Sequence, residues 1–299
     1  MDAAILFSTI PHPLSLVPFP MLGRIATVTI TAPDLRVAVA AYQRYLGYRV
    51  VDDGALGRDI ARAWGRPQLA AQRAVLLEPE SGAETYLRFV QGPAYVDHEP
   101  LSCVGWNAAE LIVQDVDALA AELANSPFRI IGPPAGRSIS EQVRAMQVVG
   151  PARELLYLTQ VTQKLADFDT PEAASFVDRI FAVVLGGASL DALQDYYHIQ
   201  FGVPRAAAVT SVISVMPLAA QCYIEADQMP PAAAANRPCI PGQLPPGAAM
   251  VSFEIDQLPG QLPSSLGPAH RSQGLPYAGR RSQACVGATG ELVELIESG

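Results

Sequence analysis

Histidine is the commonest metal ligand and general base in proteins, so the histidines are the first candidates for chemistry in this sequence. The chain of 299 residues has four of them, and they are widely spaced. They are His12, His98, His198 and His270. This spacing matches no familiar metal-ligand set, so each is expected to be a surface or structural residue.

The cysteines and the single lysine limit the chemistry further. The cysteines are Cys103, Cys222, Cys239 and Cys285, and no two of them form a CxxC pair. This pattern favours free thiols in a reducing compartment, so a cytoplasmic protein is expected. Lys164 is the only lysine and lies in a predicted linker, which disfavours Schiff-base chemistry. Glycine-rich phosphate loops and nucleophile elbows are absent from the sequence.

Composition limits the partners. The formal net charge is −9 and the arginines are scattered, so we expect no nucleic acid partner. Residues 1–22 are apolar, but Asp2 and several prolines make them unlike an export signal or a membrane span. We therefore expect no membrane association, and an N-terminal arm that lies on the protein or on a partner subunit.

The elements that must position any site form a repeat. The stretch "RIATVTITAPDLRVAVAAYQRYLGYRVV" from residue 24 reads as a strand, an acidic turn, an amphipathic helix and a second strand. Two alternating strands follow in "RAVLLEPESGAETYLRFVQ". Weaker copies of this β-α-β-β-β order begin near residues 105, 176 and 248, with Asp115 and Ser189 as expected helix caps. In the fourth copy, prolines interrupt the segment where the helix would stand.

These units resemble the modules of the vicinal oxygen chelate superfamily, which includes glyoxalase I, bleomycin-resistance proteins and extradiol dioxygenases. The similarity is clearest in "TVTITAPDLRVAVAAYQRYLGY" and "GATGELVELIE". The resemblance implies an α+β fold in which four βαβββ modules pair into two half-open barrels. We expect the arm over residues 1–22, a first barrel over 23–165 and a second barrel over 175–299. Such barrels commonly pair, so a homodimer is also expected.

In that superfamily, a histidine in the first strand and a glutamate in the last strand of a module hold a metal ion. The corresponding first-strand positions are Thr27, Ala108, Arg179 and Met250. The corresponding last-strand positions are Arg88, Tyr157, Glu225 and Glu294. No histidine is retained, so we expect no metal and no other cofactor. Glyoxalase I and extradiol dioxygenase activities are therefore not expected.

The expected first barrel offers a binding site. Thr27, Arg88 and Tyr157 are predicted to face one pocket, with Trp64 and Trp106 nearby. A guanidinium and a phenol beside aromatic walls suit a carboxylate or phenolate on an aromatic ligand. In the alternative interpretation, Arg88 points outward and the aromatic residues belong to the core. Trp64 is either a lid contact or a residue that packs the helix end onto the barrel.

The expected second barrel offers catalytic candidates. Arg179, Glu225 and Glu294 take the former ligand positions, and two carboxylates across a cavity beside an arginine could move protons. The alternative is that both glutamates are scaffold residues that pair with Arg179.

The sequence leaves three functions open. The first is a metal-independent lyase or isomerase that acts on a small aromatic or apolar acid. The second is a noncatalytic protein that sequesters a small molecule, of the bleomycin-resistance type. The third is a metal-dependent glyoxalase-like or dioxygenase-like enzyme with an atypical site.

Overall fold

The structure is a computed structural model, and it describes residues 21–137, 140–163, 168–205, 210–230, 233, 238–260, 262 and 264–299. The N-terminal arm expected over residues 1–22 lies outside the described residues except for Met21 and Leu22, and Lys164 also lies outside them.

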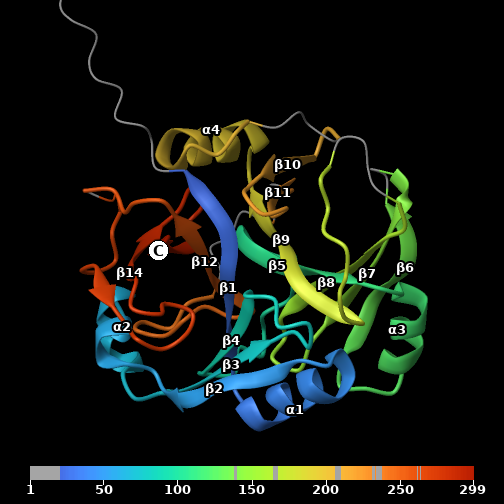
Figure 1. The fold of residues 1–299 in the computed structure, drawn as a ribbon, viewed down its shortest axis with the longest axis horizontal. Helices are drawn as coiled ribbons and strands as arrows, with labels where there is room; N and C mark the ends of the chain where they lie inside the picture. Colours follow the sequence, from blue (N-terminus) through green and yellow to red (C-terminus); the bar gives the residue numbers. More distant parts are fainter. Residues whose placement is uncertain are drawn as a thin grey trace, which may run out of the picture.

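All four repeated units are present (Figure 1). The first contains β1 (Leu22–Ala32), α1 (Leu35–Leu46), β2 (Arg49–Ala55), α2 (Arg58–Ala63), η1 (Pro67–Leu69), β3 (Arg73–Glu78) and β4 (Tyr86–Gln91). The second contains β5 (Gly105–Val113), α3 (Val116–Leu123), β6 (Arg129–Arg137), β7 (Ser140–Val149) and β8 (Leu155–Val161). The third contains β9 (Val177–Gly187), α4 (Leu190–Phe201), β10 (Ile213–Pro217) and β11 (Tyr223–Gln228). The fourth contains β12 (Ala248–Ile255), β13 (His270–Arg271), β14 (Arg281–Val286) and β15 (Leu292–Glu297).

Local signals explain where the helices begin and end. The side chain of Asp115 accepts hydrogen bonds from two backbone amides at the start of α3, and Ser189 accepts one from Ala192 at the start of α4. Gly47 and Gly202 follow α1 and α4 in the left-handed conformation, with φ of 68° and 63°. The helix caps expected at Asp115 and Ser189 are therefore confirmed. Among the described residues, the fourth unit has no helix between its first two strands, in agreement with its prolines.

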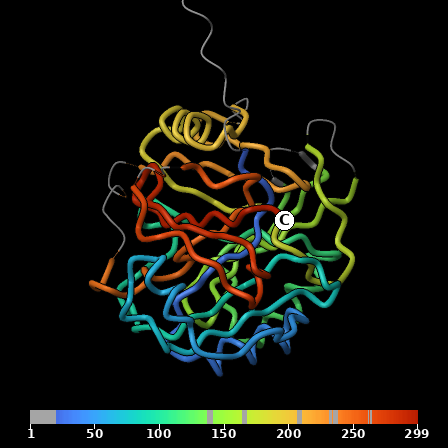
Figure 2. Tube along the Cα trace, turned by 60° about the vertical axis from the view of Figure 1, so that its left-hand side comes forward, coloured from blue at the N-terminus to red at the C-terminus, as the bar shows by residue number. Residues whose placement is uncertain are grey.

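The strands form two sheets. Sheet A has the order β13-β14-β15-β12-β1-β4-β3-β2, and sheet B has the order β10-β11-β9-β5-β8-β7-β6. The antiparallel pair β1 and β12 forms the centre of sheet A, and Figure 2 shows the first and last parts of the chain lying side by side there. The antiparallel pair β5 and β9 forms the centre of sheet B.

This pairing corrects the expected domains. The first unit shares its sheet with the fourth, and the second shares its sheet with the third, so residues 23–165 and 175–299 are not separate barrels. One continuous buried core also contains side chains from all four units. The hydrogen bonds between central strands join the first unit to the fourth and the second unit to the third, so the segment near 165–175 separates no two cores.

The two sheets pack against each other through this core. Trp106 of β5 contacts Phe253 of β12, with ring centroids 5.8 Å apart. Because side chains alternate along a strand, Val28 and Ile30 of β1 enter the core while Thr27 and Thr29 face the other way. We call the face of each sheet that turns away from the shared core its cavity face.

None of the helices in the described ranges is both long and apolar enough to cross a membrane.

Candidate functional site

Glu294 lies at the centre of the cavity face of sheet A. Its side chain is fully buried, and three neighbours donate hydrogen bonds to it. Trp64 Nε1 and the Tyr277 hydroxyl donate to Oε1, over 2.8 and 3.0 Å. Ser252 Oγ donates to Oε2 over 2.6 Å. This set of donors suits a carboxylate, because each oxygen receives at least one strong hydrogen bond.

Arg88 lies beside this carboxylate. Its Nη1 is 3.7 Å from Glu294 Oε2 and 3.4 Å from Thr29 Oγ1. The guanidinium carbon lies 5.2 Å from the Trp64 ring centroid and 5.4 Å from that of Tyr277, which is cation–π distance. Arg88 is only 4% exposed, and its Nη2 has no hydrogen-bond partner among the described residues. A buried guanidinium nitrogen without an acceptor is costly, so this atom marks a place where an acceptor is needed.

A cavity of about 50 Å³ lies against Arg88. It is bounded by β2, the start of α2, β3 and the loop before β14. Its lining includes Asp52, Leu56, Ile60, Ala74, Leu76, Leu275 and Tyr277. The cavity therefore combines several apolar side chains with the Arg88 guanidinium, the Asp52 carboxylate and Tyr277.

Strand register and a tight turn bring these residues together. The parallel pairs place Thr29 opposite Arg88 and Ser252 opposite Glu294. Trp64 ends α2, and Gly65 follows it with a φ of +65°. A side chain at position 65 would come within 2.7 Å of the Leu266 carbonyl oxygen, so a glycine is needed where α2 meets this segment.

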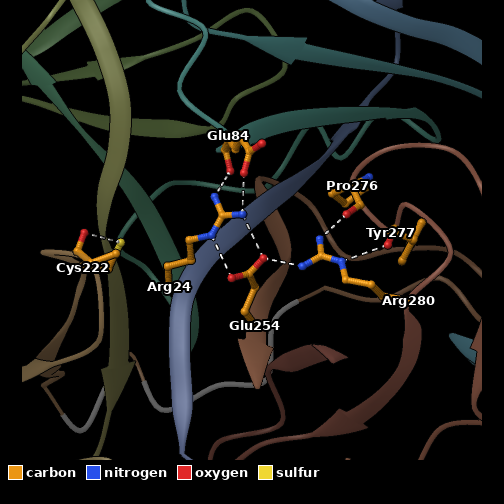
Figure 3. Close-up of polar contacts among 8 residues, drawn as sticks. Arg24, Glu84, Cys222, Glu254, Pro276, Tyr277 and Arg280 are labelled. Atoms are coloured by element: carbon orange, nitrogen blue, oxygen red, sulfur yellow. Dashed lines mark hydrogen bonds and ion pairs between the residues drawn. The ribbon is translucent and has the colours of Figure 1, made fainter. Parts of the chain in front are cut away.

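An ionic network fixes the loop that carries Tyr277 (Figure 3). Arg24 Nε donates to Glu254 over 2.8 Å, and Arg280 Nη1 donates to the same carboxylate over 2.5 Å. Arg280 also donates to the carbonyl oxygens of Tyr277 and Pro276. Burial raises the pKa of Glu254, but the hydrogen bonds from the two arginines outweigh it and hold the pKa below its usual value. The network therefore ties the Tyr277 loop to the central strands of sheet A.

Two further groups at the site are held neutral. Burial raises the pKa of Tyr277 well above its usual value; Arg88 opposes this shift and Glu294 adds to it. Burial also lowers the pKa of His270, which Glu294 opposes, and the His270 ring contacts Ser282 Oγ at 3.1 Å. Tyr277 is therefore a hydrogen-bond donor at neutral pH.

The cavity face of sheet B carries a second pair of carboxylates. Glu110 and Glu225 are both buried and line one cavity of about 50 Å³. Phe181 and Tyr223 form part of its wall. Thr159 Oγ1 donates to Glu110 over 2.5 Å.

The structure brings together only some of the predicted binding residues. Arg88 and Trp64 share the site on sheet A, and Thr27 lies on the same face, one alternation away from Thr29. Tyr157 is on β8 of sheet B, so it does not face Arg88. Trp106 donates from Nε1 to the Leu292 carbonyl oxygen, packs in the core between the sheets and lines a separate cavity of about 300 Å³, so it does not share the site of Arg88.

The three predicted catalytic residues do not lie together in one site. Glu225 lies in sheet B and Glu294 in sheet A, so these carboxylates do not face each other. Glu225 is opposite Val184, five residues from Arg179 along β9, or roughly 16 Å at the rise of a strand. Arg179 instead donates to Gln221 Oε1 at a turn. Neither carboxylate therefore has Arg179 as a partner in one site.

The first-strand positions were predicted in the wrong register. The residues opposite the last-strand positions are Thr29, Glu110, Val184 and Ser252. Thr29, Glu110 and Ser252 each lie two residues beyond the predicted position, so the predicted residue is on the same face of the strand. Val184 lies five residues beyond the predicted Arg179, so Arg179 is on the opposite face. Sequence reasoning also missed Tyr277, because it lies in a loop with no periodic pattern. Glu110 could have been noticed as a single acidic residue within the apolar run "AAELIV".

Comparisons with known proteins agree with this architecture. The crystal structure of glyoxalase I from Zea mays superposes with a TM-score of 0.60 and 15% identity, covering 92% of each chain. A putative dioxygenase from Bacillus subtilis superposes with a TM-score of 0.62 and 14% identity, covering 93% of this chain and 86% of that one. The chain has the vicinal oxygen chelate fold. The α+β class and the paired half-barrels that the sequence implied are confirmed. No protein-family model and no curated protein sequence matches the chain.

The residues at the ligand positions of this fold do not fit a divalent metal. In sheet A the four positions are Thr29, Arg88, Ser252 and Glu294. Arg88 cannot act as a metal ligand, and the Glu294 oxygens already accept hydrogen bonds from three donors. In sheet B the four positions supply two carboxylates, and the described residues contain no group of three or more acidic, histidine or cysteine side chains arranged to hold a metal.

Proposed function

We propose that this chain is a small-molecule-binding protein of the vicinal oxygen chelate fold, whose ligand enters the cavity face of sheet A without a metal. The observation that carries the proposal is Arg88 Nη2, which is buried and has no acceptor among the described residues, on a side chain that lines the cavity. A bound molecule with an acceptor oxygen would satisfy this nitrogen and fill the cavity.

The hydrogen bonds of Glu294 favour binding over proton transfer. A general base needs a lone pair that faces the reacting proton. Trp64, Tyr277 and Ser252 all donate to Glu294, and Arg88 covers the remaining side. This arrangement supports a fixed structural carboxylate that orients Arg88, so we prefer the noncatalytic alternative to a lyase or isomerase that uses Glu294.

A fragment titration tests the proposal. The chain has only two tryptophans, so its NMR spectrum contains two indole N–H signals, and Trp106→Phe assigns them. Neutral and charged fragments of about five to eight heavy atoms should include compounds that shift the Trp64 signal, because that indole lies against Arg88. If no fragment shifts it, while the protein stays folded, the binding function in sheet A is wrong. Metal analysis of protein purified without chelator should give far less than one equivalent of any transition metal.

Sheet B supports a second candidate function, proton transfer between Glu110 and Glu225. Both carboxylates line the same cavity, which is the arrangement that the sequence analysis sought in the wrong pair. A simple carbon acid such as 2-butanone tests this candidate in deuterated buffer. Deuterium should enter its α-carbon faster with the native protein than with Glu225→Gln or Glu110→Gln. Equal rates for all three proteins would remove this candidate.

A further inference from the structure

We infer that the cavity beside Arg88 selects a neutral ligand with a carbonyl-type oxygen, and disfavours a carboxylate. This inference rests on the proposed function, and it names the class of ligand for that site. It reverses the sequence-based expectation of an acidic ligand, which did not place the Glu294 carboxylate beside Arg88.

The charge of the site is already balanced. The single positive charge of Arg88 lies 3.7 Å from the carboxylate of Glu294, and both side chains are buried. Among the described residues that line the cavity, Asp52 is the only other charged one, and it is acidic. His270 supplies no compensating charge at neutral pH, because its ring is held neutral. A ligand carboxylate would therefore face at least as much negative as positive charge.

Arg88 still needs a hydrogen-bond acceptor. Its Nη1 faces Glu294 and Thr29, whereas Nη2 is buried without a partner among the described residues. A neutral carbonyl oxygen can accept from Nη2 without adding charge to the cavity. It also avoids the desolvation cost that a carboxylate would incur beside the buried side chains of Arg88 and Glu294.

The remaining wall fits an apolar body. Leu56, Ile60, Ala74, Leu76 and Leu275 line the cavity. A ligand that carries one carbonyl oxygen on a short apolar group would therefore match both the guanidinium and the wall. Aldehydes, ketones and esters of small size belong to this class.

Two probes of equal heavy-atom count separate the classes. 2-Butanone is a neutral carbonyl compound, and propionate has the same skeleton with a carboxylate oxygen in place of a methyl group. Both are titrated against the full chain, and the Trp64 indole N–H signal reports binding. The Trp106 signal is the internal reference, because that residue lines a different cavity. We expect butanone to bind at least about threefold more tightly than propionate at neutral pH.

Variants show whether the probe uses Arg88. Removal of Arg88 alone would leave the Glu294 charge buried without its partner, so Arg88→Met is combined with Glu294→Gln. This pair should weaken butanone binding about fivefold or more, whereas Ala74→Leu should abolish it by filling the cavity.

The outcomes distinguish failure of the neutral-ligand inference from failure of the proposed binding function. Tighter binding of propionate at the Trp64 signal would overturn the neutral-ligand inference and leave the binding function intact. Equal butanone affinity in the double variant would also overturn the inference, since apolar contact alone would then explain binding. If neither probe shifts Trp64, the inference is wrong, and the wider fragment panel decides the binding function by itself.

Discussion

Trp64 Nε1 donates a hydrogen bond to Glu294 Oε1 over 2.8 Å, although the two residues are 230 positions apart in the chain. The contact joins the end of a short helix in the first unit to the last strand of the fourth unit. Both groups are fully buried, so the hydrogen bond is shielded from water. Trp64 is therefore part of the site: it hydrogen-bonds to Glu294, and its ring covers the guanidinium of Arg88.

Trp64→Phe should destabilise the protein more than Trp106→Phe. Both indoles are buried and donate one hydrogen bond of 2.8 Å, but Trp64 donates to a carboxylate and Trp106 to the carbonyl oxygen of Leu292. Hydrogen bonds to charged groups contribute about 1.5–3 kcal/mol, against about 1 kcal/mol for neutral pairs. Urea unfolding of both variants measures the difference. Equal losses of unfolding free energy in the two variants would show that the hydrogen bond from Trp64 to the Glu294 carboxylate contributes no more than a neutral hydrogen bond.

Glu154 should make stability depend on pH. Glu154 is the residue just before β8, and its side chain is buried. Its Oε1 accepts a hydrogen bond from the Tyr42 hydroxyl over 2.8 Å, whereas its Oε2 has no partner among the described residues. Burial raises the pKa of Glu154 from 4.5 to about 7, although hydrogen bonds from Tyr42 and the backbone oppose the shift. The protonated form is thus favoured in the fold. Its stabilisation is complete below the unfolded pKa and is lost as the pH rises through about 7.

Urea unfolding between about pH 5 and pH 8 measures this dependence. The native protein should gain up to about 3 kcal/mol relative to Glu154→Gln as the pH falls across this range. The repeat supplies a matched control, because Tyr197 donates to Glu291 over 2.8 Å in the same arrangement. Glu291 also accepts from Ala288 and from Thr289, so Glu291→Gln should destabilise the protein through the loss of these hydrogen bonds. A difference between native protein and Glu154→Gln that does not change with pH would contradict the prediction.

The repeated fold was readable from the sequence because its signals are local. Helix caps such as Ser189 and the alternation in "TVTIT" depend on neighbouring residues alone. The choice of partner for β1 is not local: β1 pairs with β12 across the length of the chain, and the alternation of β1 would suit either neighbour. The pairing of units, and with it the domain division, therefore needed the structure.

The site was half predictable for a similar reason. Arg88 and Glu294 were found because the last strands of the repeats align with each other. Ser252 was missed because the first-strand position was placed two residues too early, at Met250, and an error of two residues leaves the strand's alternation unchanged. Tyr277 was missed because its position depends on the bond between Arg280 and Glu254, and no sequence period reports such a contact.

Glu254→Gln should destabilise the protein at neutral pH by about 2 kcal/mol, because two partly buried arginines lose their common carboxylate. The pKa of Glu254 is lowered in the fold by Arg24 and Arg280 against the effect of burial. Its contribution is therefore present above the usual carboxylate pKa of 4.5, and it is lost as the pH falls through the lower folded value. The exposed pair of Asp53 and Arg73 is the control, and Asp53→Asn should change stability by less than about 1 kcal/mol. A loss for Glu254→Gln as small as that of Asp53→Asn would show that the network is dispensable.

Gly65→Ala should move Trp64 out of its contact with Glu294. Position 65 has a φ of +65°, which an alanine adopts at a cost, and its new methyl group would lie 2.7 Å from the Leu266 carbonyl oxygen. Relief of that contact requires the end of α2 to shift away from Leu266, and Trp64 is the residue immediately before the glycine. We expect a loss of about 2 kcal/mol or more together with a changed Trp64 indole N–H signal. Gly54 in the edge strand β2 is the matched control, since its added methyl group meets nothing within 4 Å. Gly54→Ala should therefore leave the indole signal unchanged, and an unchanged signal in Gly65→Ala as well would mean that the turn at Gly65 does not position Trp64.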